Sequence, residues 1–218
     1  MKIGIIGAGN IGGALTRRLA ELGHEVSVAN SRGPETLTGL VAETGARAVD
    51  VTEAALGAEV AIVTIPEKGV PGLPSGLFDE AARDVAVVDT GNYYPQRDGR
   101  IEAIEDGMPE SRWVESRLGH PVIKAFNNIR AQHLLEHGKP KGAPGRIALP
   151  VSGDDESAKA KVLAIVEELG FDAVDAGGLD ESWRQQPVTP AYAADLDAAG
   201  LREALAAAEP VRSEDWRA

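Results

Sequence analysis

The chain has 218 residues, with 22 basic and 34 acidic side chains and a formal net charge of −12. Such an acidic surface repels phosphate backbones and anionic lipid, so we expect neither a nucleic-acid nor a membrane partner. Cysteine is absent, which excludes disulfides and thiolate metal sites and leads us to expect a cytoplasmic protein. Aromatic residues make up only 4% of the chain, so the core must consist mainly of Val, Ile, Leu and Ala.

Short apolar runs alternate with helical stretches along the chain. Strands are expected at residues 2–6, 25–30, 47–50, 60–65, 85–89, 122–126, 147–151 and 173–175. Between the first two strands, Ile11, Leu15 and Leu19 share one helical face, and Gly23 is suited to a left-handed cap. We expect further helices at 158–169 and 201–208 and a mobile tail at 209–218. This order predicts an α/β fold of Rossmann type, with a doubly wound, mostly parallel sheet.

A glycine-rich loop follows the first strand directly and opens the first helix. Gly7 permits the tight turn, Gly9 lets the backbone approach a pyrophosphate, and Gly12 lets the helix and strand pack closely. The helix N-terminus supplies N–H donors for the phosphates. The expected cofactor-binding residues of this loop are Gly7, Gly9, Asn10, Ile11 and Gly12. A GxGxxG loop in this context predicts a dinucleotide-binding site.

The end of the second strand indicates which dinucleotide is bound. NAD-binding proteins usually carry an acidic residue there, whereas this chain has Asn30, Ser31 and Arg32. The carboxylate that would repel a 2′-phosphate is missing, and a hydroxyl and a guanidinium that could bind one are present. The sequence therefore favours NADP. The alternative is a polar loop that only caps the next helix.

Small, amide and hydroxyl residues follow the later strands, beside Tyr93 and Tyr94. In a doubly wound sheet these strand ends meet at the ligand crevice. The residues expected to bind the nicotinamide part of the cofactor are Thr64, Ile65, Pro66, Asn92, Ala125 and Asn127. Turns, helix caps and ordinary strand positions would explain the polar members of this set equally well.

The residues expected in the crevice do not include a conventional pair of a general acid and a general base. Lys124 and Asn128 could act as a proton donor and its orienting partner, but an ion-paired lysine at a strand end is the more ordinary interpretation. Hydride transfer between two bound cofactors needs only positioning. We therefore assign no catalytic residue.

Residues 133–137 match the HxxEH pattern of inverted zinc peptidases. His133 and His137 would share one face of a helix, as zinc binding requires. However, the helix is expected to end at Gly138, and the sequence offers no convincing third ligand. We therefore expect no metal.

With these motifs in hand, the chain resembles the NADP oxidoreductases that depend on the deazaflavin coenzyme F420. The resemblance rests on residues 7–12, 30–32, 63–66, 151–157 and 175–179. It implies an NADP-binding Rossmann domain at 1–138, a small C-terminal domain at 139–218 that completes the cleft, and a homodimer. The loop at 89–95 departs from the family. Residues 124–128 look more like a wider group that includes the cytosolic domains of membrane ferric reductases, which pass hydride to a flavin.

The resemblance implies hydride transfer between NADP(H) and coenzyme F420. One alternative is an NADPH-dependent reductase of another flavin or of a small carbonyl compound. A second alternative, of a different class, is a non-catalytic protein that senses NADP(H) and signals to a partner.

Overall fold

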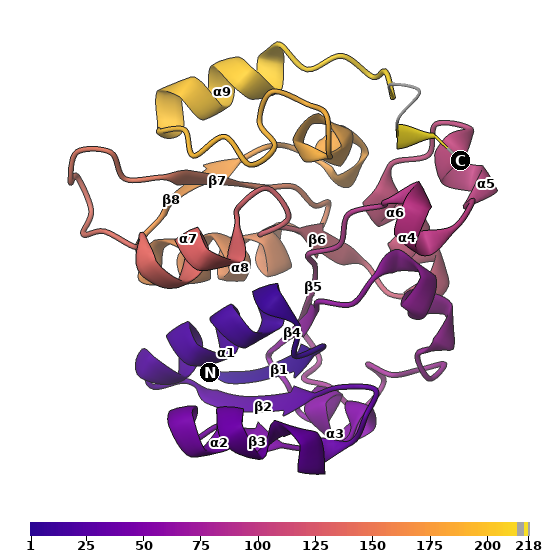
Figure 1. Ribbon diagram of the computed structural model, residues 1–218, viewed down its shortest axis with the longest axis vertical. Coiled ribbons are helices and arrows are strands. Elements are labelled where there is room, and N and C mark those ends of the chain that lie inside the picture. The colour runs from indigo at the N-terminus through magenta and orange to yellow at the C-terminus, as the bar shows by residue number, and fades with distance from the viewer. Residues whose placement is uncertain (213–215, 218) are drawn as a thin grey trace.

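The strands form two parallel sheets in the computed structural model, which describes residues 1–212 and 216–217 (Figure 1). The six-stranded sheet has the order β3-β2-β1-β4-β5-β6, and every neighbouring pair is parallel. Its strands are β1 (Lys2–Ile6), β2 (Glu25–Ala29), β3 (Arg47–Ala48), β4 (Val60–Val63), β5 (Ala86–Asp89) and β6 (Val122–Lys124). This order reverses between β1 and β4, so the predicted doubly wound Rossmann-type sheet is confirmed.

The second sheet contains β7 (Ala148–Val151) and β8 (Asp172–Asp175). An isolated antiparallel bridge between Lys124 and Ser152 places it next to β6. Several expected strands are shorter in the structure, because residues such as Thr64, Ile65 and Phe126 leave the sheet to line a crevice. The strands therefore end where the candidate site begins.

Helices and 3₁₀ turns connect the strands. They are α1 (Asn10–Glu21), η1 (Pro34–Leu37), α2 (Thr38–Thr44), α3 (Val51–Ala55), η2 (Glu67–Gly72), α4 (Pro95–Asp98), α5 (Glu102–Glu105), α6 (Glu110–Leu118), α7 (Ala131–Glu136), α8 (Glu156–Glu168), η3 (Leu179–Gln185) and α9 (Ala198–Ala206). Gly23 follows the end of α1 with a φ of 85°, as expected for a left-handed cap. α8 begins before residue 158, because the Asp155 carboxylate accepts hydrogen bonds from the backbone N–H groups of Ser157 and Ala158.

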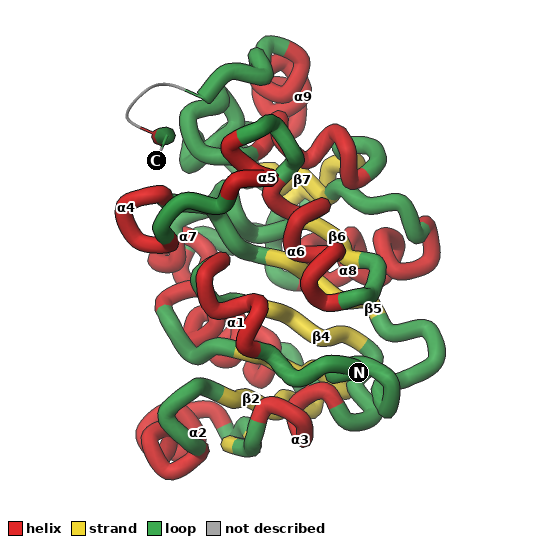
Figure 2. Tube along the Cα trace, turned by 90° about the vertical axis from the view of Figure 1, so that its right-hand side faces the viewer, coloured by secondary structure: helices red, strands yellow, loops and turns green. Residues whose placement is uncertain are grey.

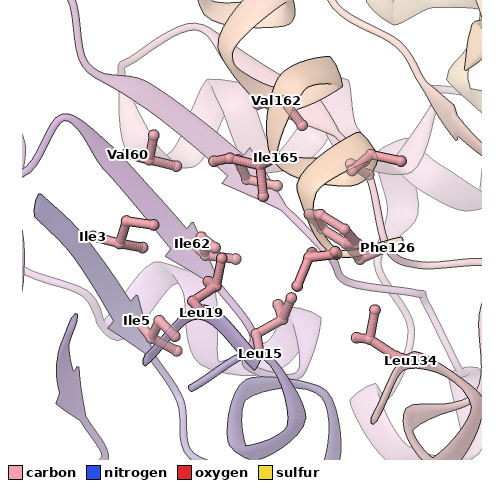
Figure 3. Close-up of a cluster of buried hydrophobic side chains, with 14 of the residues drawn as sticks. Ile3, Ile5, Leu15, Leu19, Val60, Ile62, Phe126, Leu134, Val162 and Ile165 are labelled. Carbon is pink, nitrogen blue, oxygen red and sulfur yellow. The ribbon is translucent and has the colours of Figure 1, made fainter. Parts of the chain in front are cut away.

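Alternate residues of the large sheet enter separate cores, because both of its faces are covered by helices. On one face, Leu15 and Leu19 of α1 pack with Ile3, Ile5 and Ile62 of the sheet (Figure 3). The opposite face packs against residues from α3 and the segment before β5, which include Ala54, Leu77 and Phe78. The sheet is thus buried on both sides, and only the ends of its strands are open to a ligand.

The larger core includes residues on both sides of the predicted domain boundary near residue 138. Val162 and Ile165 of α8 lie in the same cluster as Leu15, Leu19 and Phe126 (Figure 3). α9 covers the β7–β8 sheet from the side opposite α8 and lies at the end of the molecule away from α2 and α3 (Figures 1 and 2). The division at residue 138 therefore remains a prediction.

The tail expected at 209–218 is only partly described, since residues 213–215 and 218 lie outside the described residues. Its described part packs on the protein: the Arg212 guanidinium pairs with Glu110, and the Trp216 ring lies 5.2 Å from the Tyr94 ring. No helix within the described residues is both long and apolar enough to cross a bilayer.

Candidate functional site

The glycine-rich loop lies between β1 and α1, next to the end of β4. Gly7 has a φ of 112°, and a Cβ atom on Gly12 would lie only 1.8 Å from the carbonyl oxygen of Gly7. The Thr64 hydroxyl donates a hydrogen bond of 2.5 Å to the same carbonyl. Gly7 and Gly12 are therefore required by the packing of the protein itself, and Thr64 braces the loop.

Gly9 differs from its two neighbours in the motif. A Cβ atom at this position would meet nothing within 4 Å, and its φ of −75° suits any residue. No contact within the described chain therefore requires glycine here. A ligand whose pyrophosphate approaches the backbone would explain the glycine, so the loop fits a dinucleotide.

The N-terminus of α1 can also receive an anion. Gly9 caps this twelve-residue helix without any side-chain hydrogen bond, and its first turn contains no acidic residue. The orphan N–H groups and the positive end of the helix dipole are left for a ligand. We take these features, with the open space at Gly9, as the evidence that the site fits a pyrophosphate.

Asn30, Ser31 and Arg32 form the loop at the end of β2. The Asn30 side chain belongs to the loop itself: its Oδ1 accepts from the Arg32 N–H at 2.9 Å, and its Nδ2 donates to Thr36 Oγ1 at 2.9 Å. Ser31 and Arg32 are exposed, and the described residues offer their side chains no hydrogen-bond or ion-pair partner. Asn30 thus shapes the loop and leaves two polar side chains free for a ligand.

Two pockets meet at this loop. Ser31 lines one pocket with Gly7, Ile65, Pro66 and Lys68, directly beside the glycine-rich loop. Arg32 lines the other, an open pocket along α1 and α2 that also includes Gly9 and Asn10. Ser31 and Arg32 therefore flank the place where the adenosine end of a dinucleotide would leave the glycine-rich loop.

A crevice lies beyond the ends of β1, β4, β5 and β6, as expected for the switch point of a doubly wound sheet. The structure brings most of the predicted site residues together there: Gly9, Asn10, Ile11, Thr64, Ile65, Pro66, Asn92 and Asn127. Residues outside the predicted cofactor-binding set also line it: Thr90, Gly91, Arg97, Phe126, Ile129, Arg130, Ala131 and Tyr192. Most of these lie in turns whose direction only the folded sheet defines, and Tyr192 comes from the distant C-terminal segment.

Asn92 and Asn127 belong to a buried amide network. Asn127 Nδ2 donates to Asn92 Oδ1 at 3.0 Å and to the Gln185 carbonyl at 2.7 Å, and Asn127 Oδ1 accepts from Gln185 Nε2 at 2.9 Å. The Ser152 hydroxyl in turn donates to Gln185 Oε1 at 2.9 Å. Both N–H groups and the oxygen of the Asn127 amide are therefore hydrogen-bonded within the protein. The network joins the loops after β5 and β6 to η3 and so fixes the wall of the crevice.

Two expected crevice residues lie elsewhere. Ala125 is fully buried in the core and lines none of the three pockets around the glycine-rich loop. Tyr93 is also buried, and its hydroxyl lies within hydrogen-bonding distance of the Gly99 carbonyl, at 2.9 Å, and of Glu105, at 2.8 Å, on the far side of the β5 loop. Of the two predicted tyrosines, only Tyr94 faces the crevice, since neighbouring residues in this extended segment point in opposite directions.

Tyr94 meets Tyr192 across the crevice. Their hydroxyl oxygens are in direct contact, and the Arg97 guanidinium lies 4.7 Å from the centre of the Tyr94 ring. Burial and the neighbouring Tyr192 hydroxyl raise the pKa of Tyr94 above its ordinary value. The Tyr94 hydroxyl therefore keeps its proton more firmly than a free tyrosine and is presented in the crevice.

Lys124 lies beneath the crevice and does not open into it. Its side chain is fully buried, and Nζ donates to Asp89 Oδ2 at 3.0 Å and to the Gly91 carbonyl at 2.6 Å. Burial opposes the charged ammonium, but the carboxylates of Asp89, Glu110 and Glu67 outweigh it and raise the pKa of Lys124. The ion-paired interpretation is confirmed, and Asn128 does not orient this lysine because its amide donates to the Ala191 carbonyl at 3.4 Å.

Two buried glutamates surround the Lys124–Asp89 pair. Both carboxyl oxygens of Glu67 and one of Glu110 are buried without a hydrogen-bond partner. Burial, together with the nearby Asp89 carboxylate, raises the pKa of Glu67 well above its usual value, and burial also raises that of Glu110. The raised pKa of Glu67 favours its neutral form, which limits the negative charge that this buried cluster must hold.

The sequence of the N-terminal part matches a known family. Residues 2–93 match the family model described as NADP oxidoreductase, coenzyme F420-dependent. The family resemblance is confirmed over these residues. They include β1, α1, the glycine-rich loop, the Asn30–Arg32 loop and the strand ends at Thr64 and Thr90. The part of the crevice that contains the glycine-rich loop is thus the part that matches the family's sequence.

Two individual proteins are also similar in sequence to this chain. The protein YjhV of Escherichia coli (strain K12) is 42% identical over 73 residues, which cover 33% of this chain and 53% of YjhV. Metalloreductase STEAP3 of Rattus norvegicus is 29% identical over 179 residues, which cover 82% of this chain and 34% of that protein. The chain thus spans about half, or less, of these two relatives.

Solved structures extend the likeness beyond residue 93. The hypothetical protein SMa0349 of Sinorhizobium meliloti is 29% identical, covers 90% of this chain and 95% of its own, and superposes with a TM-score of 0.75. A candidate F420-dependent NADP reductase from Arthrobacter sp. FB24 is 23% identical, covers 82% and 86%, and has a TM-score of 0.64. The second likeness shows the fold alone. The family match over residues 2–93 supports an NADP-dependent oxidoreductase, and the solved structures support the Rossmann-type fold.

Proposed function

We propose that the chain is an NADP-dependent oxidoreductase that transfers hydride between NADP(H) and the deazaflavin coenzyme F420. The observation that carries the NADP part is the β2 loop, where an acid is missing and Ser31 and Arg32 are left without protein partners beside the glycine-rich loop. The family match over residues 2–93 supports the F420 part.

Each part of the site has a role in this proposal. The glycine-rich loop and the N-terminus of α1 bind the pyrophosphate, with Gly9 allowing close approach. Ser31 and Arg32 bind the 2′-phosphate, and Asn30 holds their loop in place. Ile65 and Pro66 provide an apolar wall for the nicotinamide, while Thr64 braces the loop from below. Asn92 and Asn127 keep the opposite wall rigid, and Ala125 supports it from the core.

NADP(H), when bound, supplies or accepts the hydride, so the chain needs only to position the two reactants and exclude water. The crevice suits this task, because its lining combines Ile65, Pro66 and Phe126 with amides and hydroxyls. Arg130 is exposed at the same crevice and has no described side-chain partner, so it is available to an anionic reactant.

One observation favours a second candidate, an NADPH-dependent reductase of a small carbonyl compound. Tyr94, whose pKa is raised, presents its hydroxyl in the crevice in contact with that of Tyr192, and a carbonyl oxygen that receives a hydride needs a proton donor. Direct hydride transfer to a deazaflavin does not require this pair. Substitution of Tyr192 by Phe would thus impair carbonyl reduction and leave deazaflavin reduction almost unchanged.

Mixing the purified protein and NADPH separately with oxidised F420, FAD, FMN and a panel of carbonyl compounds tests the proposal. Loss of the NADPH absorbance with F420 alone is the expected result. Turnover only with a flavin or carbonyl compound would overturn the F420 part, and tight NADPH binding without any turnover would indicate a sensing protein. Light scattering on the same sample tests the proposed homodimer.

A further inference from the structure

The fold brings the two histidines of the HxxEH segment to an acidic residue from the far end of the chain. His133 lies in α7, and His137 follows its end, so the two side chains share one face four residues apart. Asp195 belongs to the segment before α9. One ligand atom from each of these three residues lies within 4.8 Å of the other two. Asp195 thus lies where a third ligand would be needed, which the sequence alone does not reveal.

The contacts inside this cluster suit a shared cation better than a simple hydrogen bond. His133 Nδ1 and Asp195 Oδ2 are 2.5 Å apart, but this nitrogen is buried and makes no contact with hydrogen-bond geometry. The two imidazole rings stack with their centres 4.4 Å apart and their planes 15° apart. Two protonated rings in this arrangement would repel each other, whereas two neutral rings can both direct a lone pair toward a metal.

The donor set indicates the class of metal. Two imidazole nitrogens and one carboxylate oxygen match the ligands that zinc accepts in tetrahedral sites with one open position. Calcium and magnesium require mainly oxygen ligands, so they are disfavoured. Nickel and copper also bind imidazole and serve as competitors in any test. The net charge of −12 adds a general attraction for cations.

We propose that His133, His137 and Asp195 form a binding site for one zinc-like divalent cation. The site joins α7 to the C-terminal segment that carries Tyr192 into the crevice. Two further bonds hold this segment: the Ala193 N–H donates to the Asn128 carbonyl at 2.8 Å, and the Asn128 amide donates to the Ala191 carbonyl. The cation would therefore link α7 to this segment and stabilise the side of the crevice that Tyr192 lines.

The site differs from that of an inverted zinc peptidase. Glu136 would be the general base in that family's pattern, but here it accepts from Gln132 and lines the open pocket with Arg32, along α1. The cation has a structural role in this proposal, and the proposal does not depend on the identity of the hydride partner.

Calorimetric titration of tag-free, chelator-treated protein with zinc chloride tests the site, with nickel and magnesium chlorides as comparisons. We expect one zinc per chain, no measurable magnesium binding, and a thermal midpoint that rises with zinc. His133→Ala and the conservative Asp195→Asn, at an exposed position that should fold normally, should each weaken zinc binding by about tenfold or more.

His120→Ala is the matched control, because His120 lies outside this cluster: its ring nitrogen bonds to the Pro121 carbonyl, and its ring packs edge-on against Phe78. It should leave zinc affinity unchanged. Absence of saturable zinc binding to the unmodified chain would overturn the proposal. So would equal losses in His120→Ala and His133→Ala, or an unchanged affinity in Asp195→Asn, since the histidines would then bind zinc only as surface groups.

Discussion

Arg32→Ala tests the choice of cofactor most directly. The 2′-phosphate is a dianion in an acidic protein, and Arg32 is an exposed cation beside the glycine-rich loop without a described partner. A hydrogen bond to a charged group contributes about 1.5–3 kcal/mol, and about 1.4 kcal/mol corresponds to a factor of ten. Because Arg32 is exposed and screened by solvent, we expect a value near the lower end of that range. Affinity for NADPH should fall about tenfold, and at most about a hundredfold.

Affinity for NADH should barely change, because NADH lacks the phosphate. Dissociation constants for both nucleotides, measured by fluorescence or calorimetry for the unmodified chain and the variant, give the result. Arg47→Ala is the matched control: it removes the same charge from the exposed edge strand β3 but lines none of the three pockets around the glycine-rich loop. Equal losses for NADPH and NADH, or an unmodified chain that prefers NADH, would refute the assignment.

Asn30→Asp should change selectivity in the same direction, by repelling the phosphate and accepting from the ribose hydroxyls. The structure indicates that this variant should also be less stable. Asn30 Nδ2 donates to Thr36 Oγ1, and a carboxylate cannot make that bond, so the loop loses about 1 kcal/mol of support. A lower thermal midpoint with a shift toward NADH is the expected combination.

Three more predictions follow from the packing of the site. Gly9→Ala should leave the thermal midpoint unchanged and weaken the binding of NADPH and of NADH alike by about tenfold. The reason is that a Cβ atom there meets no protein atom but would stand where the pyrophosphate is proposed to lie. A drop in stability instead would contradict this prediction. Lys124→Ala should lower the stability by about 3–5 kcal/mol, because it leaves the Asp89 carboxylate buried without its ion-pair partner. The protein that still folds should keep most of kcat. A loss of about a hundredfold in kcat with the fold intact would show that Lys124 is catalytic. The pKa of Glu67 is higher in the folded than in the unfolded chain, so the free energy of unfolding should fall as pH rises above the ordinary carboxyl pKa, by up to about 1.4 kcal/mol per pH unit from this group, until the raised pKa of the folded state is reached. Glu67→Gln should flatten that slope in denaturant titrations, and equal slopes would contradict the raised pKa.

The local sequence determines the parts of this protein that depend on near neighbours in the chain. The β1–loop–α1 unit could be predicted residue by residue, because Gly7, Gly12 and the apolar face of α1 act within a few turns of each other. The parallel sheet follows from the alternation of strands and helices, and the absence of an acid after β2 is likewise visible without coordinates.

Tertiary structure decides whatever depends on direction or on contacts between distant segments. A strand residue can face the crevice or the core, so Tyr94 lines the crevice while Tyr93 and Ala125 are buried. Lys124 could have been a proton donor until folding placed it against Asp89. Tyr192 and Asp195 reach the crevice and α7 only because the C-terminal segment folds back over the loop after β6. Spacing in the sequence does not reveal these long-range contacts, because they result from the packing of α8 against the Rossmann core and of α9 on the β7–β8 sheet.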